Sequence, residues 1–163
     1  MARPLVFILL VAALLSFAAC SGSSSSRQTP GRVDVRIGGL RIDAELALTG
    51  EARSLGLGRR SSLAEGAGML FVFREDGEEA FWMKEMGFPL DFVWISSDRK
   101  VVDLTQDVAP PAAGTPDSEL PLYRPSHPVR YVLEVNAGVV RANGIGIGDV
   151  VTFEPDVSPE DAS

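Results

Sequence analysis

Cysteine and histidine are almost absent: Cys20 and His127 are the single examples of each among 163 residues. One cysteine cannot form a disulfide within the chain, so the fold must depend on its hydrophobic core. One histidine excludes a multi-histidine metal site. Thioether ligands would select Cu(I), but the spacing of Met69, Met83 and Met86 matches no copper motif, and methionine fills cores well. We therefore predict neither a metal site nor a cofactor.

Positive charge is also scarce, since 15 Lys and Arg face 22 Asp and Glu, for a net charge of −7. Proteins that bind nucleic acid neutralise phosphates with a surplus of basic residues, so we do not expect this protein to bind nucleic acid. The same acidity gives no attraction to anionic lipid except through an anchor. No glycine-rich phosphate loop follows a predicted strand, which argues against nucleotide binding.

Long apolar runs are missing too, because the longest, residues 5–15, is shorter than the roughly 20 residues that span a bilayer. Arg3, this run and Ala18-Ala19 have the pattern of a secretory signal peptide over residues 1–19. Cys20 follows at once, and the segment resembles a bacterial lipoprotein signal, in which that cysteine is lipidated. The alternative is an ordinary secreted protein with a stray cysteine.

Residues 20–31 are rich in Ser and Gly, which predicts a lipidated, flexible tether. We therefore expect an exported protein, anchored to a membrane by lipid and facing the periplasm or the cell exterior. Its folded part would be a single domain over residues 32–154. The acidic, Pro- and Ser-containing residues 155–163 are predicted to be a disordered tail that is dispensable for folding.

The stretch from residue 68 to residue 95 holds most of the aromatic side chains. Residues 69–73, 80–83 and 90–95 are short apolar runs, and each is expected to be a strand. The charged residues 74–79 between the first two runs predict a turn, and hence a hairpin. This stretch is expected to supply most of the core.

The remaining patterns also favour strands. Residues 33–37 and 40–46 alternate apolar and polar side chains around Gly38-Gly39, a strong hairpin signal. Further strands are predicted at 101–104, pairing with 90–95, and at 131–135 and 150–153. Short helices are predicted from Thr49 to Leu55 and over residues 137–142, and a long loop over 106–120. The fold class is therefore mainly β with two short helices, as a small closed or half-open antiparallel β-barrel.

Four short motifs occur in a fixed order: residues 68–71 (GMLF), 81–84 (FWMK), 89–91 (PLD) and 131–134 (YVLE). With Gly56-Leu57 upstream and Gly148-Asp149 downstream, the chain resembles the bacterial and archaeal domain of unknown function 192, also called uncharacterised protein family 0127. The resemblance covers about residues 33–153. It implies a compact, mostly β domain that is often exported, and it implies no settled activity.

The chain departs from the family pattern in two places. The family usually has Met where this chain has Gly58, and Asn-Thr where it has Glu85-Met86. If the Asn amide fixes a ligand in relatives, Glu85 changes that contact, because an ionised carboxylate only accepts hydrogen bonds.

Several polar or aromatic residues near the central stretch are candidate ligand-binding residues: Arg60, Trp82, Lys84, Glu85, Asp91 and Glu134. Asp91 begins an apolar strand, so it needs a partner: Lys84, Arg60 or backbone N–H groups of the Gly87-Phe88 turn. The more conservative interpretation of Asp91 is a structural cap. Trp82 is either core, which is favoured, or a platform at a rim. Glu134 is either on the solvent face or part of a site.

Two functions remain. The first is a binding or accessory module for an unknown small molecule or protein, using the rim near Trp82, Lys84, Asp91 and the 106–120 loop. The second is a hydrolase or transferase with Asp91 and Glu134 as acid–base partners, which requires both carboxylates to face one cavity. Ser126-His127 are adjacent in sequence, but a catalytic triad needs a third group in the correct geometry. The binding module is favoured, and catalysis is not expected.

Overall fold

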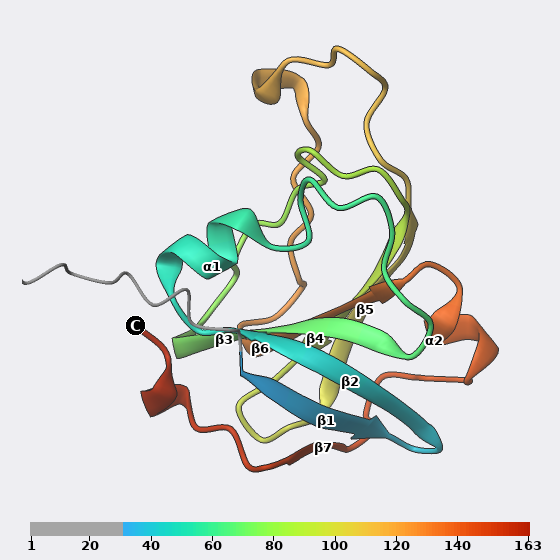
Figure 1. Ribbon diagram of the computed structural model, residues 1–163. Coiled ribbons are helices and arrows are strands. Elements are labelled where there is room, and N and C mark those ends of the chain that lie inside the picture. The colour runs from blue at the N-terminus through green and yellow to red at the C-terminus, as the bar shows by residue number, and fades with distance from the viewer. Residues whose placement is uncertain (1–30) are drawn as a thin grey trace, which may run out of the picture.

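The computed structural model describes residues 31–163 (Figure 1). In chain order, its strands and helices are β1 (Arg32–Ile37), β2 (Leu40–Ala47), α1 (Gly50–Leu55), β3 (Ala67–Gly77), β4 (Leu90–Ile95), β5 (Val101–Val108), the 3-10 turn η1 (Asp117–Glu119), β6 (Val129–Asn136), α2 (Val139–Ala142), β7 (Val151–Glu154) and the 3-10 turn η2 (Pro159–Asp161). The predicted signal peptide, Cys20 and all but the last residue of the predicted tether lie outside the described residues. Within residues 31–163, no helix is long and apolar enough to cross a membrane.

The strands form one seven-stranded sheet in the order β5-β4-β6-β3-β2-β1-β7. Neighbours pair antiparallel except β2 and β3, which are parallel. The sheet curls, and a bridge between Lys100 and Val150 connects the beginnings of its two outermost strands, β5 and β7. The result is a half-barrel, which confirms the predicted fold class.

The hairpin predicted around Gly38-Gly39 is confirmed, with β1 and β2 in register from Ile37–Leu40 outward. Gly38 has a φ of 57°, a left-handed conformation that glycine adopts without steric cost. Gly31, the last residue of the predicted tether, already contacts the sheet, because the Leu46 amide donates to its carbonyl at 2.8 Å. The predicted pairing of the 90–95 and 101–104 strands is also confirmed as β4 and β5.

The predicted hairpin between residues 69–73 and 80–83 is wrong. β3 runs on to Gly77 through the charged residues, and its partners are β2 and β6. Asp76 is an exposed strand residue held by Arg130 of β6 at 2.7 Å, so its charge marks a solvated strand end rather than a turn. Residues 80–83 form no strand, and Phe81 makes a single bridge to Tyr123.

Both faces of the sheet are covered, and each has its own hydrophobic core (Figure 1). Val93 and Leu133 belong to the core on the side of β7 and the C-terminal segment, whereas Phe92 and Val132 belong to the core on the side of α1. Because successive side chains of a strand point to opposite faces, all six residues of β4 are buried.

The C-terminal segment, residues 155–163, differs from the predicted disordered tail. Val157 and Ala162 are each 2 % exposed and join the core on the β7 side. Ser158 caps η2, and the Ser163 amide donates to the Leu48 carbonyl at 2.9 Å. The acidic composition of the segment led to the prediction of disorder. Two apolar residues at the right spacing, Val157 and Ala162, are nevertheless enough to pack it against the sheet.

Candidate functional site

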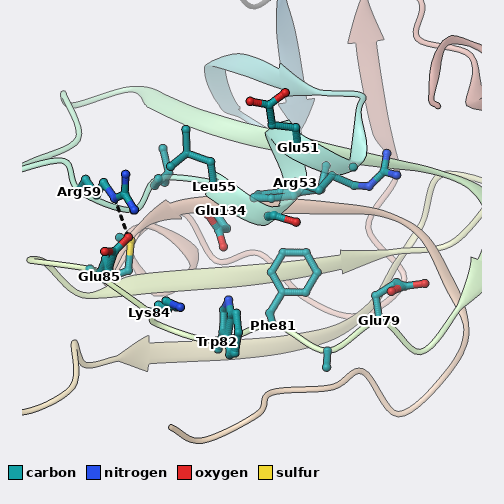
Figure 2. Close-up of a pocket in the computed structure, with 18 of the residues that line it drawn as sticks. Glu51, Arg53, Leu55, Arg59, Glu79, Phe81, Trp82, Lys84, Glu85 and Glu134 are labelled. Carbon is teal, nitrogen blue, oxygen red and sulfur yellow. Dashed lines mark hydrogen bonds and ion pairs between the residues drawn. The ribbon is translucent and has the colours of Figure 1, made fainter. Parts of the chain in front are cut away.

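A pocket of about 770 Å³ opens on the α1 side of the sheet (Figure 2). One wall is formed by α1 and the loop after it, residues 50–59. The opposite wall is the irregular segment of residues 79–86, and the floor is formed by β3 and β6. The volume lies within the range of about 300–1,000 Å³ that small-molecule sites occupy.

Local sequence signals determine where α1, which forms one wall of the pocket, begins and ends. The Thr49 side chain accepts the Ala52 amide at 3.1 Å and begins the helix, and Gly56 ends it with a φ of 50°. A Cβ at Gly56 would lie 3.3 Å from the Phe71 ring, so glycine also allows the chain to approach the floor closely. Leu57, 1 % exposed, anchors the loop in the core.

Glu134 is the buried acid at the floor of the pocket (Figure 2). It is 5 % exposed, because it lies on the same face of β6 as Val132 and is paired in register with Phe92 and Met69. Burial raises the pKa of its carboxyl group to about 8, against a smaller opposing attraction from Arg60. No hydrogen bond from the described residues offsets this rise. The carboxyl group is therefore an unpartnered polar group that faces the pocket.

Arg60 is held away from Glu134 by another acid. Its guanidinium donates two hydrogen bonds to the Glu45 carboxylate, at 2.7 and 2.9 Å. These bonds lower the pKa of Glu45 and raise that of Arg60. Arg32 lies 3.5 Å from the same carboxylate. Arg60 therefore acts on Glu134 by long-range attraction and not by direct contact.

The other basic side chains of the pocket are already engaged. Arg59 forms an ion pair with Glu85 at 2.7 Å, and Lys84 forms one with Asp117. Arg53 donates to the Leu48 and Val72 carbonyls at 2.7 and 3.0 Å. The pocket thus has no basic group, among residues 31–163, that is both close to its floor and free of a partner.

Aromatic rings form the apolar part of the pocket. Phe71 and Phe81 pack edge to face with centroids 4.9 Å apart. Trp82 is 43 % exposed, and the Lys84 ammonium lies 5.4 Å from the centre of its ring. The favoured prediction of a core Trp82 is therefore wrong, and it is Trp94 that is fully buried. Trp82 instead lies exposed at the rim of the pocket, the position that the second interpretation gave it.

Asp91 lies on the opposite face of the sheet from this pocket. Its two carboxylate oxygens accept the Asp107 amide at 2.8 Å and the Val140 amide at 3.0 Å. The predicted partners Lys84 and Arg60 bind other acids instead, and the donors are not those of the Gly87-Phe88 turn. The structural interpretation of Asp91 is the one this geometry supports, because it ties β4 to β5 and to the beginning of α2.

The acid–base hypothesis required Asp91 and Glu134 in one cavity, and the sheet separates them. Asp91 is paired in register with Val135 and Phe92 with Glu134, so the two carboxylates alternate to opposite faces. Ser126 gives no alternative nucleophile: its hydroxyl donates to Asp103 at 2.8 Å and lies 3.1 Å from His127 Nδ1. In a triad the histidine lies between serine and acid, whereas here the serine lies between them.

A family model described as "Uncharacterized ACR", DUF192, matches residues 33–153. The chain belongs to the DUF192 family. The crystal structure of a proposed transcription regulator from Sinorhizobium meliloti 1021 is similar, with 30% identity and a TM-score of 0.69 over 77% of this chain and 96% of that one. A protein of unknown function from Novosphingobium aromaticivorans DSM 12444 has 28% identity and a TM-score of 0.64, over 76% and 84% of the two chains. No curated protein gives a significant match.

The two departures from the DUF192 pattern both line the pocket. Glu85 has a φ of 56°, a left-handed conformation that Asn adopts more readily than most residues. The family's Asn at this position thus has a backbone explanation that needs no ligand. Gly58 lies in a crowded place: a Cβ there would lie 3.0 Å from the Leu55 carbonyl oxygen and 3.4 Å from that of Lys84, so a larger residue such as the family's Met requires the neighbouring backbone to shift.

Four of the predicted site residues of this DUF192 domain line one pocket: Trp82, Lys84, Glu85 and Glu134. Arg60 is outside its lining and pairs with Glu45, and Asp91 is on the other face of the sheet. Sequence reasoning missed the α1 wall and Phe71. Gly56-Leu57 was recognised as a family motif, but no local pattern shows that this loop faces Trp82. No cluster of three or more metal-ligating side chains occurs within residues 31–163.

Proposed function

We propose that this DUF192 domain is a binding module for a small organic molecule, carried at a membrane by the lipidated Cys20. The single observation that carries the binding proposal is the unpartnered Glu134 carboxyl group at the floor of an open, aromatic-lined pocket. No fully buried side-chain oxygen within residues 31–163 lacks a partner, so the carboxyl oxygens of Glu134 are open to the pocket rather than sealed in the core. A site that retains such a group has a donor or acceptor available for a ligand.

The composition of the pocket supports a ligand with an apolar body. Phe71, Phe81 and Leu55 offer apolar surface, and the exposed Trp82 ring extends it to the rim. The Sinorhizobium meliloti relative is described as a transcription regulator. The net charge of −7 argues against nucleic-acid binding by this chain, because phosphate contacts need basic residues.

The binding proposal is tested with phenylbutanol, a neutral probe with one aromatic ring, in a backbone-amide NMR titration. We expect saturable shifts of the Trp82 indole N–H and of the amides of residues 54–58, with the Trp94 indole N–H as an internal reference on a buried ring. Absence of saturable shifts, or shifts confined to β1, β7 and the C-terminal segment, would contradict the proposal.

The anchor proposal depends on the leader and on Cys20. We expect Cys20→Ser to move the protein from the membrane fraction to the soluble exported fraction, because acyl chains contribute about 0.8 kcal/mol per buried CH₂ to membrane binding. Ser21→Ala is the matched control and should remain with the membrane. An unchanged distribution and an unchanged intact mass of the Cys20→Ser protein would contradict lipidation.

A further inference from the structure

The charges of the pocket differ in one respect: its bases are paired and several of its acids are not. Arg59 and Lys84 form ion pairs, and Arg53 is held by backbone carbonyls. Glu51 and Glu79 line the rim and, among residues 31–163, form no ion pair, and Glu134 at the floor has no hydrogen bond. A ligand that enters therefore meets carboxyl groups without an ion-pair partner, whereas each of these basic groups already has a carboxylate or carbonyl partner.

We infer that the ligand is an organic amine whose apolar body packs on Phe71, Phe81 and Trp82 and whose ammonium group pairs with Glu134. The inference rests on the proposed binding function and names its ligand class. An ammonium donates charge-assisted hydrogen bonds of about 2.7–2.9 Å to a carboxylate. It would supply the partner that the Glu134 carboxyl group lacks. An anionic ligand would instead meet like charge at Glu51 and Glu79, and also at Glu134 once that carboxyl group ionises.

A proton leaves when this pair forms. Burial keeps Glu134 protonated in the free protein at neutral pH, since its pKa is raised to about 8. Pairing with an ammonium breaks the carboxyl O–H bond, and the proton passes to water or buffer while the ligand keeps its own charge. Arg60 is the charged group that acts on Glu134 from outside the pocket lining. The charged groups that line the pocket with Glu134 are Glu51 and Arg53 of α1, Arg59 of the following loop, and Glu79, Lys84 and Glu85 of the opposite wall.

The test compares phenylbutylamine, phenylbutanol and phenylbutyrate, which share one body and differ in charge. At about pH 8.5 we expect the amine to bind at least about tenfold more tightly than the alcohol, and the acid to bind most weakly. Below about pH 8, amine affinity should fall by up to about tenfold per pH unit while alcohol affinity stays constant. At about pH 7, where Glu134 is protonated in the free protein, calorimetry in buffers of different ionisation enthalpy should show release of a proton with the amine alone.

Two variants assign the effect to the floor of the pocket. Glu134→Gln should bring amine and alcohol affinities within about twofold and abolish the proton release, while Glu75→Gln, an exposed acid outside the pocket, should leave both unchanged. The wild-type pH dependence gives an independent readout if Glu134→Gln folds poorly. Equal binding of amine and alcohol, or tighter binding of the acid, would overturn the amine inference and leave the binding module. No binding of any of these probes would overturn both.

Discussion

Asp91 and Glu134 are buried carboxylic acids on adjacent strands, yet their surroundings are opposite. Asp91 is 0 % exposed and accepts two backbone amides on the face closed by α2 and the C-terminal segment. Glu134 is 5 % exposed, has no hydrogen bond, and faces the open pocket under α1. Burial alone therefore does not mark a functional acid. What distinguishes the two is whether the protein itself supplies the partner.

Removal of Asp91 should have the largest effect on stability. Asp91→Ala leaves the Asp107 and Val140 amides without their acceptor, so we expect a loss of about 4 kcal/mol in the free energy of unfolding. Asp91→Asn keeps one acceptor oxygen and should lose less. Urea unfolding measures both, with the exposed Glu75→Ala as control. If Asp91→Ala were as stable as wild type, these hydrogen bonds would not be structural.

Glu134 should make the protein less stable as the pH rises. Between the unfolded pKa of 4.5 and the folded value of about 8, the folded state holds a proton that the unfolded state has lost. Raising the pH therefore favours unfolding, by about 3 kcal/mol from about pH 5 to about pH 7.5. Glu134→Gln should flatten this slope in urea unfolding series. A parallel slope in both proteins would show that another group is responsible.

Deletion of residues 155–163 should open the Asp91 side of the sheet. It removes Val157 and Ala162 from that core and the Arg53 hydrogen bond to the Ser163 carbonyl, so we expect a loss of about 2 kcal/mol. Val157→Ala should reproduce part of this loss, and the exposed Glu160→Ala should not. A truncated protein with the wild-type melting temperature would restore the original prediction of a dispensable tail.

Trp82→Ala should have the smallest effect on stability and a clear one on binding. The side chain is 43 % exposed, so its loss should cost less than about 1 kcal/mol. Phenylbutanol affinity should fall by about tenfold, because aromatic contact at the rim is lost. Leu122→Ala removes an exposed apolar side chain outside the pocket and is the control that separates contact with the probe from a general loss of apolar surface. Unchanged phenylbutanol affinity would place the probe away from the rim.

The contrast between the two acids also explains what the sequence could and could not predict. Period-2 alternation and Gly38-Gly39 predicted β1 and β2, because hairpin register is a local property. The hairpin predicted between residues 69–73 and 80–83 was wrong because β3 pairs with β2 and β6 instead. No local pattern shows these pairings, since they join segments that are separated in sequence. Alternation along β6 alone could not show whether the face of Glu134 was covered. That depends on α1, which lies far away in sequence.

The most direct measurement is the pKa of Glu134 by NMR titration of its side-chain carboxyl carbon, in the free protein and with saturating phenylbutylamine. We predict a midpoint of about 8 in the free protein. We also predict a clear downward shift of this midpoint when the ammonium is bound, because an opposite charge favours the ionised carboxylate. A midpoint near the ordinary value of 4.5 in the free protein, unchanged by the amine, would contradict the claim that Glu134 is a protonated, unpaired acid that binds an ammonium group at the floor of the pocket.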